Sequence, residues 1–368
     1  MIDEAVLKSE EKAVLALRGL YKKYGYQPYK VSKFEEYELY LRNKDFLVSD
    51  RIITFNDTGG QLLALKPDVT LSIIKTGEDI RGVKQKVCYN ENVYRVSEST
   101  NHFKEIMQAG LECIGDIDIY DVSEAIILAA KSLSLLKGSF LLDVSHLGIL
   151  SAILEEISSD EGFLKDATAY IAAKNAHDLR ALCEKEGVTG DKTEKLLSLI
   201  KIYGKRSEVI KKLEAICSSD KAKKALSELS ELSALLDGTE FSDKIFFDFS
   251  VVNDMNYYSG IVFKGFIDGI CEGILSGGRY DKLMKKLGRK SGAVGFAIYL
   301  DLLEGLNKMK ERSVDYIVLY DDKTDKKDVL KAVKGAADEG KSASAQKALP
   351  YDLKYGAIID LRKEAPEC

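Results

Sequence analysis

The most constraining feature of the sequence is the segment at residues 93–115, VYRVSESTNHFKEIMQAGLECIG. It opens with alternating side chains, passes through a polar loop and continues at residues 106–114 as a largely apolar strand, which predicts an antiparallel hairpin. Side chains repeat every second residue along a strand, so Gln108, Gly110 and Glu112 share one face. A carboxylate and an amide within an apolar strand need polar partners, which favours a floor beneath a small polar ligand. The alternative is an edge strand whose Glu112 points at water.

The composition excludes several classes of protein. A chain of 368 residues with 45% hydrophobic and 31% charged residues is long enough for two or more globular domains. No apolar run approaches the ~20 residues of a membrane span, and the acidic, amphipathic start is neither a signal peptide nor a transit peptide. Six cysteines without C-x-x-C spacing indicate reduced thiols and no zinc site, and a net charge of -5 gives no overall basic surface for nucleic acid. We expect a cytoplasmic protein with no metal and no cofactor.

The chain divides by its pattern into three parts. Residues 1–146 and 240–312 carry strands and amphipathic helices and form the predicted core. Between them, residues 147–239 show helical periodicity with abundant Ala, Leu, Lys and Glu, which predicts an all-helical insertion. Residues 313–368 carry one strand, one helix and a weak last strand, which predicts a short α/β C-terminal domain. The predicted fold class is therefore α+β.

Two further motifs place polar or aromatic side chains near turns. The loop LKPDVT at residues 65–70 is a proline turn, in which Asp68 or Thr70 can cap a helix that starts directly afterwards. The pair Tyr257 and Tyr258 stands beside an apolar strand. Successive side chains of a strand point to opposite faces, so we expect Tyr258 to contact a ligand and Tyr257 to belong to the core.

These motifs, in this order, resemble those of class II aminoacyl-tRNA synthetases, in particular the histidyl branch. The hairpin at residues 93–115 resembles the second signature motif, and residues 257–263 resemble the histidyl signature D-Y-Y-(S/T)-G-x-V-F, with Asn256 in place of its Asp. The glycine-rich segments at residues 277–283 and 292–300 resemble the third motif. The resemblance implies an antiparallel sheet flanked by helices, with an insertion between motifs two and three and a reduced anticodon-binding domain at the end.

The resemblance also implies where an amino acid binds. In the histidyl branch, the loop that corresponds to LKPDVT holds the α-ammonium group, and a carboxylate with a hydroxyl suits a cation that has three donors. The implied histidine or effector site consists of Asp68, Thr70, Arg95, Gln108, Glu112, Tyr257, Tyr258 and Tyr280.

The chain departs from the pattern of the enzyme where the nucleotide binds. Ser97 replaces the glutamate that reads adenine, and His102 replaces an arginine of the motif-two loop. Leu302 replaces the motif-three arginine, and Asn253 replaces the arginine special to the histidyl enzymes. A site that stabilises phosphate charge needs such cations, and losing a single donor costs about 3 kcal/mol of transition-state binding. We therefore predict no adenylation and assign no catalytic residue.

An amino-acid site without its nucleotide chemistry resembles the family of ATP phosphoribosyltransferase regulatory subunits, which are paralogues of histidyl-tRNA synthetase. The resemblance implies a non-catalytic homodimer that joins the short-form catalytic phosphoribosyltransferase in a hetero-octamer. It also implies L-histidine as the feedback effector of the first step of histidine biosynthesis, with no membrane association and no tRNA binding. Two alternatives stay open. One is an active histidine–tRNA ligase with an arginine supplied from elsewhere in the fold, and the other is an amino-acid sensor that acts on a different enzyme.

Overall fold

The structure is a computed structural model, and it describes residues 7–43, 51–77, 80, 82–97, 100–136, 138–252, 257–303, 314–351 and 353–363. The chain splits into two compact units, Met1–Glu304 and Gly305–Cys368. The finer division of the first unit into a core and an insertion stays a prediction from the sequence.

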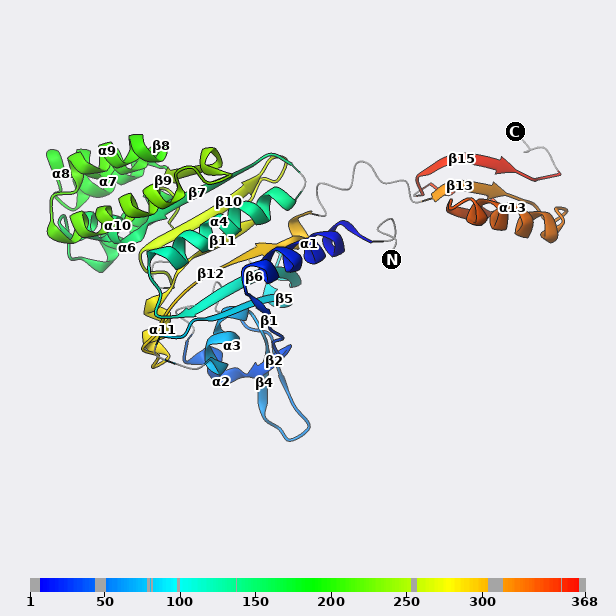
Figure 1. Cartoon of the computed structure of the whole chain (residues 1–368), viewed down its shortest axis with the longest axis horizontal. Helices are drawn as coiled ribbons and strands as arrows, with labels where there is room; N and C mark the ends of the chain where they lie inside the picture. Colours follow the sequence, from blue (N-terminus) through cyan, green and yellow to red (C-terminus); the bar gives the residue numbers. More distant parts are fainter. Residues whose placement is uncertain are drawn as a thin grey trace. The chain divides into compact units, whose positions relative to one another are not determined.

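The first unit is built around a nine-stranded sheet (Figure 1). In spatial order its strands are β1 (Gln27–Pro28), β5 (Gln85–Val96), β6 (Phe103–Gly115), β12 (Gly292–Tyr299), β11 (Leu275–Arg279), β10 (Ile261–Ile267), β7 (Phe140–His146), β9 (Ile245–Asp248) and β8 (Tyr203–Gly204). Six of the eight neighbouring pairs are antiparallel. The pairs β1–β5 and β7–β9 are parallel, so the predicted antiparallel sheet is mixed near both edges.

The predicted hairpin at the centre of the sequence analysis is confirmed. Strands β5 and β6 pair antiparallel from Gln85 opposite Ile114 to Val96 opposite Phe103. On its other side β6 pairs with β12, so β6 is an interior strand and Glu112 is only 2% exposed. The alternative of an edge strand with Glu112 in water is therefore wrong.

Two long helices, α1 (Ser9–Lys23) and α4 (Ile119–Leu135), lie along one face of this sheet (Figure 1). The buried stripe of α1 brings the Tyr21 ring edge-on to Phe296 of β12, with ring centroids 6.1 Å apart. In α4, Leu133 packs so closely against Gly265 of β10 that a Cβ there would lie 2.7 Å from a Leu133 methyl carbon. Because side chains alternate, the residues on either side of Gly265 point to the opposite face of the sheet.

Six helices follow β7 and gather at one end of the sheet (Figure 1). They are α5 (Leu147–Glu155), α6 (Glu161–Ala172), α7 (Ala176–Lys185), α8 (Asp191–Ile200), α9 (Arg206–Ile216) and α10 (Asp220–Leu236). The short strand β8 lies within this block and pairs with β9. The expectation of an all-helical segment is thus wrong at Tyr203–Gly204, because two residues extend the edge of the central sheet.

Shorter elements complete the first unit. A three-stranded antiparallel sheet consists of β2 (Phe34–Glu36), β4 (Leu62–Leu65) and β3 (Thr54–Asn56). The short helices are α2 (Tyr37–Leu41), α3 (Val69–Thr76) and α11 (Asp281–Lys286), and the 3₁₀ turns are η3 (Ser242–Lys244) and η4 (Leu300–Leu303). Helices α3 and α11 follow loops that carry predicted site residues, so their first turns bring these residues to the sheet.

The second unit is a small α/β layer, as expected from the sequence. Its parallel sheet has the order β14 (Ala343–Gln346), β13 (Val314–Leu319) and β15 (Tyr355–Asp360), and its helix is α13 (Lys326–Asp338). Sequence patterns missed β14, whose four residues ASAQ lack the bulky side chains typical of a strand. Across the described residues of both units, no helix has the length and apolar character that crossing a membrane requires.

Candidate functional site

A cavity of about 370 Å³ lies over the sheet face that is opposite to α1 and α4. All eight residues predicted for the effector site border it: Asp68, Thr70, Arg95, Gln108, Glu112, Tyr257, Tyr258 and Tyr280. They come from the start of α3, from β5 and β6, and from the segments that precede β10 and α11. The structure therefore gathers around one hollow a set of residues spread over more than half of the chain.

Strand pairing builds the floor of this cavity. Tyr89 on β5 pairs with Gly110 on β6, and Gly110 pairs with Ala297 on β12. Ala297 pairs in turn with Ser276 on β11, and Ser276 pairs with Lys264 on β10. Directly paired residues of neighbouring strands point to the same face, so these five positions form one row beneath the cavity. Sequence reasoning found only Gly110 in this row, because the register between distant strands leaves no local pattern.

Glycine is required in the floor because other groups occupy the space above it. A Cβ at Gly295 would lie 1.7 Å from Oε2 of Glu112, which shows that the Glu112 side chain extends across β12. A Cβ at Gly110 would lie 2.3 Å from the carbonyl oxygen of Phe296 and 2.6 Å from the hydroxyl of Tyr89. The two glycines therefore give Glu112 and Tyr89 their positions in the site.

Glu112 is the most constrained acid in the cavity. The Thr70 hydroxyl donates to Oε1 at 2.6 Å, and the Tyr280 hydroxyl donates to Oε2 at 2.5 Å. Burial raises the pKa of Glu112 to about 8, although both hydroxyl donors act in the opposite direction. Near neutral pH the group therefore exists in both protonation states, and its orientation is fixed by two separate elements.

Asp68 serves two purposes at the rim. It is the N-cap of α3, and its Oδ1 accepts from the backbone N–H of Leu71 at 2.9 Å, which confirms the helix-cap interpretation. The same carboxylate also borders the cavity, where burial raises its pKa and neighbouring Arg95 lowers it. Arg95 donates from Nε to the carbonyl of Pro67 at 3.1 Å and so holds the loop that carries Asp68.

Three tyrosine rings form an aromatic wall. The ring centroids of Tyr257 and Tyr258 are 4.7 Å apart, and those of Tyr257 and Tyr280 are 5.8 Å apart. The expectation that Tyr257 belongs to the core is confirmed, since it lies in the buried core cluster. The expectation that only Tyr258 faces the cavity is wrong, because both tyrosines border it. Strand β10 begins only at Ile261, so the tyrosines lie in a turn and the alternation of a strand does not apply to them.

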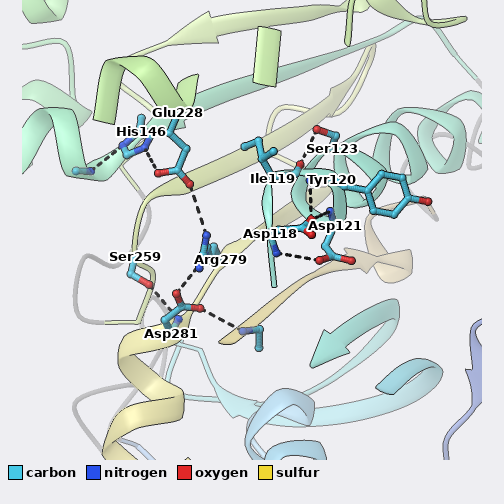
Figure 2. Close-up of polar contacts among 12 residues, drawn as sticks. Asp118, Ile119, Tyr120, Asp121, Ser123, His146, Glu228, Ser259, Arg279 and Asp281 are labelled. Carbon is cyan, nitrogen blue, oxygen red and sulfur yellow. Dashed lines mark hydrogen bonds and ion pairs between the residues drawn. The ribbon is translucent and has the colours of Figure 1, made fainter. Parts of the chain in front are cut away.

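A polar network connects the segments that carry Tyr258 and Tyr280 to helix α10, through Ser259, Asp281, Arg279 and Glu228 (Figure 2). Arg279 binds Asp281 from Nε at 2.8 Å, and the Asp281 backbone N–H donates to the Ser259 hydroxyl at 2.9 Å. Glu228 of α10 lies 3.6 Å from Arg279 and accepts from Nε2 of His146 at 3.3 Å. These contacts flank Tyr280 and Tyr258 in the chain, so they position both rings without contacting the cavity themselves.

Three residues replace nucleotide contacts of the synthetases, and the structure describes two of them. Leu302 lies half-buried in η4, and Ser97 follows β5, where its backbone N–H donates to the carbonyl of His102 at 2.9 Å. Asn253 lies outside the described residues. Among the described residues that border the cavity, Arg95 is the only arginine. Within the same ranges, no three His, Cys, Asp or Glu side chains come together as a metal ion would need.

The sheet, the motif-two hairpin and the cavity on its open face define the catalytic-domain fold of class II aminoacyl-tRNA synthetases. A family model described as histidyl-tRNA synthetase matches residues 2–303, and the chain belongs to this family. The ATP phosphoribosyltransferase regulatory subunit of Oceanobacillus iheyensis is 31% identical over 76% of this chain and 69% of that protein. The regulatory subunit of Bacillus cereus is 30% identical over 83% of this chain and 75% of that protein.

Solved structures agree with this fold. A protein from Bacillus halodurans, described as an ATP phosphoribosyltransferase regulatory subunit/histidyl-tRNA synthetase, has a TM-score of 0.73 at 23% identity and covers 99% of this chain and 97% of its own. Histidyl-tRNA synthetase from Nostoc has a TM-score of 0.71 at 18% identity over 93% of this chain and 83% of that chain. A chain of the ATP phosphoribosyl transferase (HisG:HisZ) complex from Thermotoga maritima has a TM-score of 0.62 at 18% identity, over 79% and 97%.

Proposed function

We propose that the chain is the non-catalytic regulatory subunit of an ATP phosphoribosyltransferase, and that its cavity binds L-histidine as the feedback effector of histidine biosynthesis. Curated relatives with 30% to 31% identity carry the name of that subunit. The observation that carries the proposal is the set of contacts around Glu112, which Thr70 and Tyr280 hold in place beside the remaining predicted amino-acid contacts.

The chemistry of the cavity suits histidine. Asp68 offers a carboxylate to the α-ammonium group, and Gln108 adds an amide on the cavity floor. Glu112, with its pKa raised by burial to about 8, can accept from an imidazole N–H or donate to a bare ring nitrogen. The rings of Tyr257 and Tyr258 offer a surface on which an imidazole can pack.

The proposal assigns no adenylation to this site. Leu302, Asn253 and Ser97 replace residues that the synthetases use for ATP, and none of the three supplies a guanidinium or a carboxylate. Losing one such donor costs about 3 kcal/mol of transition-state stabilisation, and losing several removes most of the rate enhancement. In this proposal the chain acts through its partner, the short-form catalytic phosphoribosyltransferase, as a homodimer within a hetero-octamer.

The test combines two assays on the full chain. In the first, histidine-dependent exchange of pyrophosphate into ATP should stay at background, whereas a clear exchange signal would favour the histidine–tRNA ligase. In the second, the short-form phosphoribosyltransferase should co-purify with the chain, gain activity from it and lose that gain when histidine is added. A phosphoribosyltransferase that ignores both the chain and histidine would contradict the proposal.

Feedback needs more than binding. Histidine acts through assembly only if it binds the two assembly states, the chain alone and the complex, with different affinity, and that difference equals the coupling free energy. Titration of histidine into the chain alone and into the complex measures that difference. Equal affinities would show that histidine does not act by changing the assembly of the complex.

A further inference from the structure

Lys264 is a cation in the cavity that no sequence motif singled out. It borders the cavity from β10 and stands at the end of the floor row that begins with Tyr89. Its aliphatic stem crosses Gly273, where a Cβ would lie 2.2 Å from Cε of the lysine. A side chain at position 273 would therefore push Lys264 away, and the glycine leaves open the path along which the ammonium group reaches the cavity.

The charge of Lys264 has no anionic partner within the described part of the chain. Its ammonium nitrogen lies 5.7 Å from the centroid of the Phe266 ring. Such a cation–π contact orients an ammonium group without neutralising it. The half-buried ammonium group of Lys264 is therefore available to an anionic group of a ligand in the cavity.

One carboxylate competes for this lysine. Asp143 on β7 is the direct cross-strand neighbour of Lys264, and opposite charges at such positions commonly pair. Here they do not: Oδ1 of Asp143 has no hydrogen-bond partner, and the electrostatic effects on its carboxyl come from Asp248 and Lys174. The lysine side chain turns instead toward Gly273 and the cavity.

The acids of the cavity and Lys264 lie at opposite ends of it. Asp68 and Glu112 are its acids, and Arg95 lies beside Asp68, where its Nε donates to the carbonyl of Pro67. Lys264 stands three strands away from Glu112 in the order β6, β12, β11, β10. Neighbouring strands are ~4.8 Å apart, so the two backbones are separated by roughly 14 Å, and the two side chains shorten this gap. The remaining distance between the two side chains suits a small molecule with a cationic group at one end and an anionic group at the other.

We propose that Lys264 binds the α-carboxylate of the amino-acid effector and so takes over a role that an arginine at the position of Asn253 has in the histidyl enzymes. This inference rests on the proposed function and deepens it, since it assigns the group that distinguishes an amino acid from its decarboxylated amine. Lys264 is then a specificity-determining residue, because a ligand without the carboxylate gains nothing from it.

Calorimetric titration of the full chain with L-histidine and with histamine tests the assignment. Histamine keeps the imidazole and the amine and lacks only the carboxylate. Lys264→Met removes the charge but keeps the stem, so histidine should bind about 10-fold more weakly or worse, which is the usual effect of losing one charged hydrogen bond. Histamine should bind the variant and the wild type equally, within about 2-fold.

Two further variants serve as controls. Lys264→Arg keeps the positive charge and should retain most of the histidine affinity. Lys104→Met removes an exposed lysine of β6 outside the cavity and should change neither affinity. Circular dichroism on each variant establishes that the chain is folded.

The outcomes separate the inference from the proposed function. If the wild type binds histidine and Lys264→Met binds it equally well, the lysine serves another partner such as Asp143, and only the inference fails. Equal weakening of histidine and histamine would also overturn it, since the loss would not depend on the carboxylate. If the wild type binds neither ligand, the proposed function fails and the inference falls with it.

Discussion

Two buried carboxylates lie on the same face of the central sheet and differ in their hydrogen-bond partners. Glu112 on β6 accepts hydrogen bonds at both oxygens, from Thr70 and Tyr280. Asp143 on β7, four strands along, has an oxygen with no hydrogen-bond partner, while Asp248 beside it takes the ammonium group of Lys174 at 2.9 Å. Burial raises the pKa of both acids, to about 8 for Glu112 and about 7 for Asp143.

The comparison shows which features, besides a raised pKa, distinguish a candidate binding residue from an acid that is only buried. Both acids lose hydration, and the pKa of each reports that loss in a similar way. Only Glu112 has donors from two separate elements that fix its direction, and only Glu112 borders the cavity. A raised pKa alone therefore does not make an acid a candidate for binding, whereas a raised pKa together with convergent donors and an open space does.

The largest expected effect is that of Glu112→Ala on ligand binding. The change removes the acid that we expect to contact imidazole and leaves the Thr70 and Tyr280 hydroxyls without their acceptor. Affinity for histidine should fall by about 100-fold, as for the loss of a buried, charged hydrogen-bond partner. Calorimetry with Glu105→Ala, an exposed acid on the same strand, as the control measures this. Unchanged affinity in Glu112→Ala would move the effector site elsewhere.

The second effect concerns stability and pH at Asp143. Its pKa is raised in the folded state by burial and by Asp248, so between about pH 3.8 and about pH 7 the folded chain binds more protons than the unfolded chain. This group therefore contributes stability that is lost as pH rises through that window. Asp143→Asn removes the buried charge, and at pH 8 it should raise the free energy of unfolding by on the order of 2 kcal/mol.

Urea titrations at pH 5 and pH 8 measure that change. The gain should be larger at pH 8, where Asp143 of the wild type is ionised, and histidine affinity should stay as in the wild type. A variant that is less stable at pH 8 would mean that Asp143 makes a favourable ion pair in solution, for which Lys264 is the neighbouring candidate.

The same argument gives a pH dependence to Glu112. Its folded pKa of about 8 lies above the ordinary value of 4.5, so its contribution to stability falls as pH rises from about 4.5 to about 8. Glu112→Gln cannot ionise and should remove this component, which flattens the wild-type decrease by on the order of a few kcal/mol. A decrease of the same size in both proteins would assign it to other groups.

The smallest effect should come from the network that connects the tyrosine segments to α10. Glu228→Gln weakens the link between α10 and Arg279, but Arg279 keeps its 2.8 Å contact with Asp281. We expect histidine affinity to fall by about 2- to 3-fold, in line with the loss of one partly exposed ion pair. Glu231→Gln, an exposed acid on the same helix, should have no effect. A loss as large as that of Glu112→Ala would make the helical block a direct part of the site.

Local patterns predicted what local geometry decides. The period of two placed Gln108 and Glu112 on one face, and the turn residues around Asp68 placed it at a helix start. The same rule failed at Tyr257 and Tyr258, because it assumed a strand where the chain turns. Whether an aromatic pair lies in a strand or just before it depends on where pairing with β7 and β11 begins, and that is a tertiary property.

Other parts of the site had no sequence signal. Lys264, Ser276 and Tyr89 meet only because four antiparallel pairings bring their strands into one register. A lysine in an apolar strand usually lies with its charge in water, so its residue type alone did not indicate the cavity. The fold class was predictable because whole motifs recur in order, while the charge arrangement of the cavity needed the sheet itself.

Gly295 limits how this cavity can evolve. A methyl group at this position would occupy the space of one carboxylate oxygen of Glu112. Even Gly295→Ala would therefore displace the Glu112 side chain from the cavity. Changes of this cavity that keep Glu112 in place must then arise at other lining positions, since position 295 admits only glycine.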